Sequence, residues 1–581
     1  MSSVTLALAA LACVALAGSV PAEAAPRQAV RVTDFGALPD DEADDTAGVL
    51  AALDRCAESG ARRLVFPPGR YRFRAGANPR SQSVLFPVTR LDGLTIEGVG
   101  AELVCSGITG VFAFDHCRSL RVRGLSIDWD RPPFSIGRVV AAAPRHFDVE
   151  MEEGYPVEGG EPVQAFMSYD PKTRLPARRG LDVYGAVTST ELVRPGVLRV
   201  RLSRDIAVPV GVLMALRHQV YAYNAFELHR CRDVVVEDCT VYTCPGMGLA
   251  ALVCEDVTLR RFRVLLRPGT NRVLSATADG SHFGGCKGTV RLEGCVFEGM
   301  GDDGANIKSG LYLTVRRIAD ERVVLAQHSL KMADVPDPGD RLEVSHPEDL
   351  LPYATLRVRK AELLPEDGMH RVELENPLPA DLREGDVLGN ASRAPKVRIS
   401  DCVVRRNRAR GMLLQTRDVR VERCRFEDCT SGAVYVMTEI VHFNESIGTR
   451  DVVVRDCVAE NCNYGAAMGD GALMVFAWLR DFAAPPRPGV HRNVRLERNT
   501  VRGTDNCAIF VSGTQGITLK GNVIEQACRK PTGDQGRSAV AIRSSSGILL
   551  EGNRIDPGRQ GAGFESAVTL AEDCVVVEPA R

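Results

Sequence analysis

Three aspartates in two short polar segments are the residues of this chain best suited to chemistry. Asp279 lies in the segment ADGSHF, and Asp302 and Asp303 lie in GDDGANIK, which begins one residue before Asp302. Carboxyl groups held close together cannot all ionise cheaply, so at least one keeps its proton to a higher pH than usual. Hydrolysis of a glycosidic bond needs such a set, with one carboxyl to protonate the leaving oxygen and one carboxylate to activate water.

Two other roles compete for the same aspartates. An aspartate at a strand end commonly bonds to a turn, and adjacent aspartates are commonly solvated. Clustered carboxylates can also bind calcium, but these segments lack a carbonyl-rich loop of the kind that completes a calcium site. Asp279 and Asp302 are 23 residues apart, which is one repeat of the chain, and this spacing favours catalysis. No metal and no other cofactor is expected.

Other polar residues are candidates to bind the substrate. His282 and Asn306 follow the acids directly, and Arg408 and Arg410 are expected to alternate on a strand and to point to one side. Arginine forks bind sugar hydroxyls, or bind neighbouring carboxylates and tune their pKa. Glu445 is a further candidate acid. The structural alternatives are a solvated charge for each arginine, an exposed loop position for Glu445 and a core position for His282.

A repeat of β-rich runs must position these residues. Runs such as VVVEDC, VRLEGC, VRISDC and VRVERC end in a cysteine, and asparagine takes the same place in later runs. Adjacent runs are 22 or 23 residues apart where no loop intervenes. A coil of this length cannot bury its inner face alone and must stack on its neighbours. The leucine-rich repeat frame is absent, so the pattern predicts a right-handed parallel β-helix, in which successive coils lie about 4.8 Å apart. Most of the cysteines are expected to be stacked free thiols.

The remaining segments divide the chain into domains. A helix from about Asp45 to Ser59 is expected to cap the amino-terminal end of the β-helix and cover its unpaired edge. Two stretches without the repeat are expected to be small inserted β domains resembling barrels. The predicted organisation is a signal peptide at 1–25, cap and coils at 26–136, an inserted β domain at 137–220, coils with the acids at 221–310, a second inserted β domain at 311–394 and coils at 395–581.

Composition limits the partners and the compartment. The formal net charge is −2, which argues against nucleic acid and anionic membranes as partners. The apolar run Leu6 to Ala17, followed by small residues, resembles a signal peptide and is too short to span a bilayer. We therefore expect a secreted, periplasmic or cell-surface protein. The acid chemistry described above predicts an oligosaccharide or glycoconjugate as its substrate. Homodimerisation is compatible with these observations.

The segments ADGSHFGGCKG and FEGMGDDGANIKSG, with LGNASRAPKVRISDCVVRRNRARGMLLQT and NES further along, resemble motifs of glycoside hydrolase family 110. The resemblance covers roughly residues 279–454. It implies a β-helical, metal-independent, inverting exo-α-1,3-galactosidase of the blood-group B type. It also implies that Asp279, Asp302 and Asp303 are the essential carboxylates, and that Asn407, Arg408, Arg410 and Glu445 hold the galactose.

Two alternatives remain open. GDDGANIKSG also resembles a motif of polygalacturonases, which are inverting β-helical enzymes with three aspartates, but no Gly-His-Gly or Arg-Ile-Lys segment accompanies it here. A non-catalytic glycan-binding β-helix would need no cluster of carboxylates. The site is expected to lie exposed on the wall of the helix, so replacing Asp302 or Asp303 by asparagine is expected to cost little stability. The sequence leaves open the sugar, the linkage and which aspartate is the acid.

Overall fold

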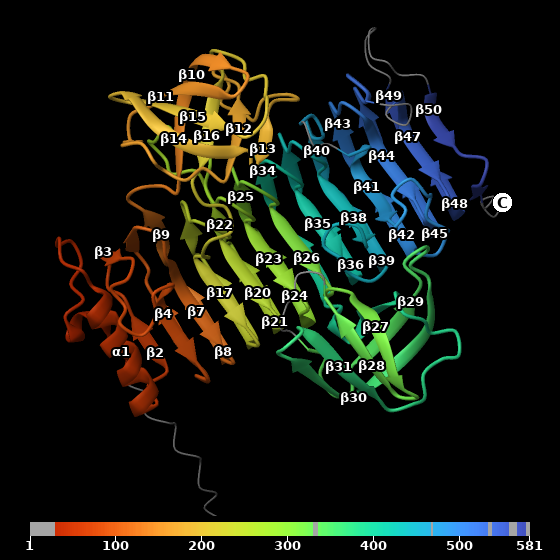
Figure 1. Cartoon of the computed structure of the whole chain (residues 1–581), viewed down its shortest axis with the longest axis horizontal. Coiled ribbons are helices and arrows are strands. Elements are labelled where there is room, and N and C mark those ends of the chain that lie inside the picture. Colours follow the sequence, from red (N-terminus) through yellow and green to blue (C-terminus); the bar gives the residue numbers. More distant parts are fainter. Residues whose placement is uncertain (1–28, 329–334, 466–468, 533–536, 557–565, 577–581) are drawn as a thin grey trace, which may run out of the picture.

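Three long parallel sheets run along a common axis and form a β-helix (Figure 1). The computed structural model describes residues 29–328, 335–465, 469–532, 537–556 and 566–576. Within these residues, sheet A has 14 strands, from β1 (Val30–Arg31) to β51 (Val575–Val576), and sheet B has 12, from β3 (Gly69–Arg74) to β49 (Arg554–Asp556). The predicted parallel β-helix is confirmed, because every strand of these sheets pairs in parallel with the strands of the preceding and following coils.

Sheet C carries the polar segments singled out above. Its 12 strands within the described residues are β4 (Val84–Thr89), β7 (Gly110–Asp115), β17 (Phe226–His229), β20 (Leu249–Leu252), β23 (Ser281–Gly284), β26 (Ala305–Lys308), β35 (Met412–Gln415), β38 (Val434–Glu439), β41 (Gly471–Trp478), β44 (Cys507–Ser512), β47 (Ser538–Arg543) and β50 (Ser566–Leu570). Figure 1 shows this sheet between two inserted domains.

Alternating side chains of each strand fill the interior of the β-helix, as the period of two residues requires. In sheet A, Val234 and Val236 of β18 (Arg232–Glu237) are buried and pair with Val257 and Leu259 of the next coil. Because the coils are in register, identical positions stack along the axis and form one continuous apolar core.

The cysteines and asparagines that end the repeated runs form a ladder inside the helix. Cys424 donates its backbone N–H to the sulfur of Cys457, and the N–H of Cys457 goes to the side-chain oxygen of Asn499. Asn499 and Asn522 continue the ladder with the same contact to the next coil. The 17 cysteines of the described residues are all free thiols, and all but one are buried.

Helix α1 (Thr46–Ser59) covers the amino-terminal end of the β-helix and packs against β1, β2 (Arg63–Val65), β3 and β4. Its buried face includes the predicted residues Val49, Leu50, Leu53 and Cys56. Among the described residues no helix is long and apolar enough to cross a membrane. The predicted signal peptide lies outside the described residues.

The first inserted domain is an antiparallel sheet of seven strands, and it lies at the upper left of Figure 1. It projects between two coils of the helix, because it follows β9 (Ser126–Trp129) and precedes β17. Its strands are β10 (Phe134–Ala143), β11 (His146–Met151), β12 (Ala165–Tyr169), β13 (Asp182–Tyr184), β14 (Val187–Arg194), β15 (Val197–Leu202) and β16 (Leu213–Arg217).

The second inserted domain is a closed antiparallel barrel with its own apolar core. It projects between β26 and β33 (Lys396–Ser400). Its strands are β27 (Leu313–Asp320), β28 (Val323–Gln327), β29 (Arg341–Ser345), β30 (Pro352–Leu364), β31 (Met369–Leu374) and β32 (Val387–Asn390). Two inserted β domains were predicted, and both are present.

Candidate active site

The three aspartates lie at the amino ends of neighbouring strands of sheet C. Asp279 precedes β23, and Asp302 and Asp303 occupy the turn before β26. The two strands pair Ser281 with Ala305, so Asp279 is level with Asp303 rather than with Asp302. The expected one-coil alignment of Asp279 with Asp302 is therefore wrong by one residue, because this coil has 24 residues instead of 23.

The carboxyl groups of Asp279, Asp302 and Asp303 meet in one cluster. One oxygen from each lies within 4.8 Å of the others. The backbone N–H of Asp303 donates to Oδ1 of Asp279 at 3.2 Å, which fixes two of the acids relative to each other. Oδ2 of Asp279 lies 2.7 Å from Nδ1 of His282.

Arg408 and Arg410 each pair with one of the aspartates. Nη1 of Arg408 donates to Asp302 at 2.9 Å, and Nη2 of Arg410 donates to Asp303 at 2.7 Å. The backbone N–H of Arg410 also donates to Asp303 at 3.0 Å. The predicted strand is absent here, since both arginines lie in a bend between β34 (Val403–Arg405) and β35. The bend is needed because the chain turns from sheet B into sheet C at this point.

The site is more buried than expected. Asp279 is 3% exposed and Asp303 is 1% exposed, while the side chain of Asp302 retains 13%. The expectation of an exposed site is therefore wrong. The arginines of the bend and residues of the first inserted domain cover the acids, and the sequence offered no sign that this distant segment returns to them.

Burial and charge separate the three acids electrostatically. Burial, followed by the charge of Asp302, raises the pKa of Asp279 well above its usual value. Burial also raises the pKa of Asp303, with Arg410 opposing and the neighbouring aspartates adding to the rise. Burial acts in the same sense on Asp302, but Arg408 and Arg410 outweigh it, so the pKa of Asp302 is lowered. Burial thus favours the protonated form of Asp279 and Asp303, whereas the arginines favour the ionised form of Asp302.

The outward face of sheet C extends this polar site. His282 and Asn306 are paired across β23 and β26, and both are buried. His282 faces away from the helix core, and burial, followed by the charge of Lys308, lowers its pKa to about 3. A neutral imidazole beside Asp279 can position that carboxyl but carries no charge of its own.

Glu445 and Asn407 lie in different surroundings. Glu445 accepts a bond from Nζ of Lys308 at 2.6 Å, and the ammonium outweighs burial and lowers the pKa of Glu445. Glu445 is therefore held ionised, and this speaks against a role as proton donor. The side chain of Asn407 donates to the backbone oxygens of Asp302 and Arg410, at 3.2 and 2.8 Å. It shapes the turn that carries the acids.

Comparison with known proteins gives a consistent picture. Residues 383–477 match the family described as "Right handed beta helix region", and residues 328–388 match "GLAA-B beta-barrel domain II". The protein is 26% identical over 571 residues to "Alpha-1,3-galactosidase B" of Bacteroides thetaiotaomicron, covering 91% of each chain. It is also 26% identical to "Alpha-1,3-galactosidase A" of Shewanella woodyi, covering 92% of each chain. The resemblance to the α-1,3-galactosidase family is confirmed.

Solved structures similar to this β-helix include the family 28 exopolygalacturonase of Yersinia enterocolitica. The TM-score is 0.40 and the identity 11%, over 94% of this chain and 79% of the other.

Four residues that contact the acids, Arg408 or the turns that hold the acids come from the first inserted domain or the segment after it. The sequence did not predict them. Arg408 Nε donates to Asp182 at 2.8 Å, and its guanidinium lies 4.9 Å from the ring centre of Tyr184. Tyr221 donates its hydroxyl to Asp302. Arg217, fully buried, donates to the backbone oxygens of Thr277 and Gly301 and so ties together the turns that hold the acids. Nothing in their local sequence distinguishes them from ordinary residues of a β domain.

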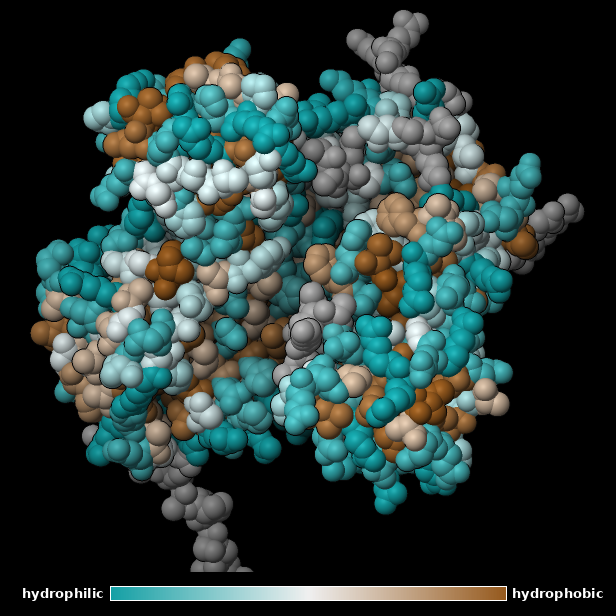
Figure 2. Space-filling model, in the orientation of Figure 1, coloured by the Kyte–Doolittle hydropathy of each residue, from teal (hydrophilic) through white to brown (hydrophobic). Residues whose placement is uncertain are grey.

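A cavity of about 500 Å³ lies on the outer face of sheet C, and its lining includes His282 and His229 but none of the three acids. His282, which bonds to Asp279, lines it together with Lys308, and Leu313 and Leu388 of the second inserted domain form part of the opposite side. In Figure 2 the surface is recessed between the two inserted domains. The arrangement provides a buried acid cluster with a roomy, largely apolar space beside it.

Proposed function

We propose that the protein is an exo-acting glycoside hydrolase that removes terminal α-1,3-linked galactose from glycans with inversion at the anomeric carbon. The observation that carries this proposal is the cluster of Asp279, Asp302 and Asp303, in which burial and two arginines divide the acids into protonated and ionised groups. The curated relatives named α-1,3-galactosidases support the choice of sugar and linkage.

In the proposed reaction the galactose lies against the cluster. One protonated aspartate gives its proton to the glycosidic oxygen while the bond from that oxygen to the anomeric carbon breaks. Water attacks the same carbon from the opposite side and passes a proton to an ionised aspartate. Arg408 and Arg410 hold the carboxylates in place, and the aromatic ring of Tyr184 lies against the guanidinium of Arg408.

The spacing of the acids bears on the stereochemistry. The nearest oxygens lie within 4.8 Å of one another, which is shorter than the roughly 6.5–9.5 Å usual between acid and base of an inverting enzyme. That rule describes two carboxylates on opposite sides of the sugar. The proposal of inversion rests on the family resemblance.

The activity is tested with an α-1,3-linked galactosyl disaccharide and with aryl α- and β-galactosides. We expect galactose from the α compounds alone, and a loss of about 10²- to 10⁴-fold in kcat for D302N and D303N. D401N, which alters an exposed aspartate paired with Arg423, is the matched control and should match the wild type. Wild-type rates in both site variants would refute the proposal, and glycan binding without turnover would favour a non-catalytic function.

The stereochemistry is tested by proton NMR of the first-formed sugar. Inversion of an α-galactoside yields β-galactose before mutarotation, whereas retention yields the α anomer. An aryl galactoside with an excellent leaving group identifies the acid, because the Asp→Asn variant that lacks the proton donor should keep its activity on that substrate while the other two variants lose theirs.

A further inference from the structure

A second group of potential ligands lies at the opposite ends of the strands of sheet C. Asp115 is the last residue of β7, His116 follows it, and His229 is the last residue of β17. The two strands are neighbours, and Asp115 pairs with His229 across them. The acids of the active site lie at the amino ends of sheet C, so this group is separate from them.

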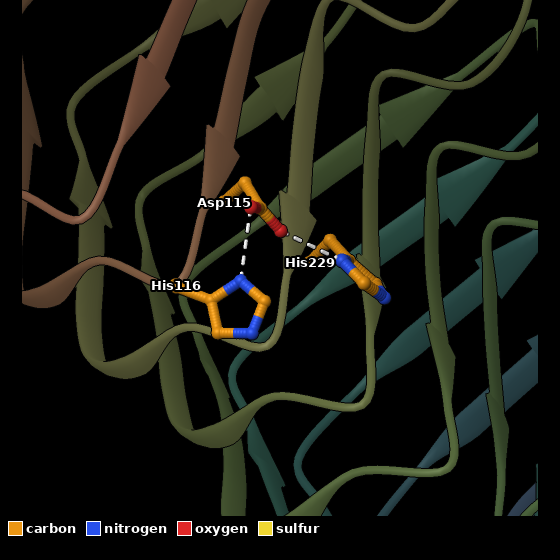
Figure 3. Close-up of side chains that lie close together, drawn as sticks. All are labelled: Asp115, His116 and His229. Atoms are coloured by element: carbon orange, nitrogen blue, oxygen red, sulfur yellow. Dashed lines mark hydrogen bonds and ion pairs between the residues drawn. The ribbon is translucent and has the colours of Figure 1, made fainter. Parts of the chain in front are cut away.

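The three side chains converge on one another (Figure 3). Nδ1 of His116 lies 2.9 Å from Oδ2 of Asp115, and Nδ1 of His229 lies 2.8 Å from Oδ1 of the same carboxyl. All three candidate donor atoms fall within 4.8 Å of one another. Each side chain is about two-fifths exposed, so the donor atoms can be reached from solvent.

These distances suit a metal ion. Zinc binds imidazole nitrogen and carboxylate oxygen at about 2.0–2.2 Å, so two ligands of a tetrahedral ion are separated by about 3.3–3.6 Å. Asp115 lies somewhat closer than this to each histidine, at 2.9 and 2.8 Å, so the three side chains need only a small opening to admit an ion. Imidazole ligands favour zinc, nickel, copper or iron over calcium and magnesium.

We propose that Asp115, His116 and His229 form a binding site for a divalent transition-metal ion such as Zn²⁺, with water completing its coordination. Binding replaces the two hydrogen bonds to Asp115 by bonds from both Nδ1 atoms to the ion, and each neutral imidazole then carries its one proton on Nε2.

The position of the site gives the ion a structural role. Asp115 and His229 are 114 residues apart in the chain, and the whole first inserted domain lies between them. An ion bound by both residues links the two ends of this long insertion, and so connects the coil before the inserted domain to the coil after it. Clips that close long loops are the ones expected to restrict the unfolded chain most.

The test is titration of untagged, chelator-treated protein with Zn²⁺ by calorimetry, and with Co²⁺ by visible absorption. We expect one equivalent to bind, an absorption band typical of nitrogen-ligated Co²⁺, and a rise of about 2 °C or more in the unfolding midpoint at saturating Zn²⁺. H116Q and H229Q should each weaken binding at least tenfold and abolish the rise in midpoint. Circular dichroism establishes that these variants are folded.

Two controls separate this site from other ligands. H146Q alters a histidine on the first inserted domain and should bind Zn²⁺ as the wild type does. D303N removes a carboxylate of the active site and should leave the titration unchanged. The proposal would be overturned if the wild-type protein bound no Zn²⁺ at about 0.1 mM, a concentration near the dissociation constant of a weak metal site. Equal binding in H116Q, H229Q and wild type would also overturn it, as would a loss of binding in D303N alone.

Discussion

At the scale of single residues, the environment of each carboxyl decides what it can do. Asp279 and Asp303 are the more buried, and their pKa values are raised, whereas two arginines hold Asp302 ionised. Chemically identical side chains within 4.8 Å of one another are thereby made different. Arg408 and Arg410 together lower the pKa of Asp302, whereas burial keeps the pKa of Asp303 raised in spite of its bond to Arg410.

Removing one of these arginines should move the pH dependence of catalysis. In R408M the carboxyl of Asp302 loses its nearest positive charge, so its pKa rises by about one unit. The limb of the kcat/KM profile governed by Asp302 should move to higher pH by that amount, whichever limb it is. R406M, which alters the arginine paired with Glu298 in the same part of the chain, should leave both limbs in place. Two unmoved limbs in R408M would contradict the assignment.

The buried pair of Lys308 and Glu445 should contribute to stability. Both side chains are little exposed, and the pKa of Glu445 is lowered in the folded protein. The contribution of Glu445 to the free energy of unfolding is therefore fully present above its unfolded-state pKa. It is lost as the pH falls through the lower folded-state pKa. E445L should cost about 3 kcal/mol at pH 7, because Lys308 is left buried without a partner. K308M/E445L should recover much of the loss in urea unfolding. Equal stability of E445L and wild type would exclude this role.

At the scale of elements, the ladder inside the helix explains why two residue types share one place in the repeat. Cys457 accepts the N–H of the preceding coil through its sulfur, and Asn499 and Asn522 accept it through the amide oxygen. The amide of Asn522 also donates to the backbone oxygen of Leu496, a bond that cysteine makes only weakly. The later coils are therefore joined by more hydrogen bonds.

The ladder yields a graded prediction. N522A leaves the N–H of Asn499 buried without its partner and removes the amide bond to the oxygen of Leu496, and an orphaned buried group costs about 1–3 kcal/mol. N522C keeps a compact acceptor in the same place and should cost less. Chemical unfolding of the two variants checks the order, and N522A as stable as N522C would show that the ladder adds packing alone.

Much of this element structure could be predicted from the sequence because it repeats. The apolar alternation and the Cys/Asn ladder recur from coil to coil, and the capping helix has an apolar pattern of its own. The sequence predicts a strand where Arg408 and Arg410 lie in a bend, because arginines at alternate positions occur both in strands and in bends. Asp182, Tyr184 and Tyr221 could not be predicted at all, because only the folded path of the first inserted domain brings them to the acids.

At the scale of the whole molecule, the first inserted domain spans the acid cluster and rests on later coils. In the segment before β13, the guanidinium of Arg178 donates a hydrogen bond to Asp505 and lies 5.1 Å from the ring centre of Tyr464. The backbone N–H of Arg179 bonds to the oxygen of Tyr464 at 3.0 Å. These contacts hold β13, and with it Asp182 and Tyr184, near the turns that carry the three aspartates.

Loosening this contact should impair catalysis from a distance. R178A should lower kcat/KM by about tenfold or more, because small displacements of positioning groups are costly in a preorganised site. R194A removes an exposed ion pair with Glu150 elsewhere in the same domain and serves as the matched control. An R178A enzyme with unchanged kinetics towards the α-galactoside would show that the domain holds its place without this contact.

The two insertions also affect how the chain is assembled during synthesis. Strand β24 (Lys287–Glu293) finds its next neighbour in sheet A only at β33, after the whole second inserted domain has been made. At about 5–20 residues per second a ribosome needs several seconds for such a stretch. During that interval the growing edge of the nascent helix stays open to other chains. Weak induction keeps few nascent chains in the cell at one time, so it should lower such encounters and raise the yield of intact protein.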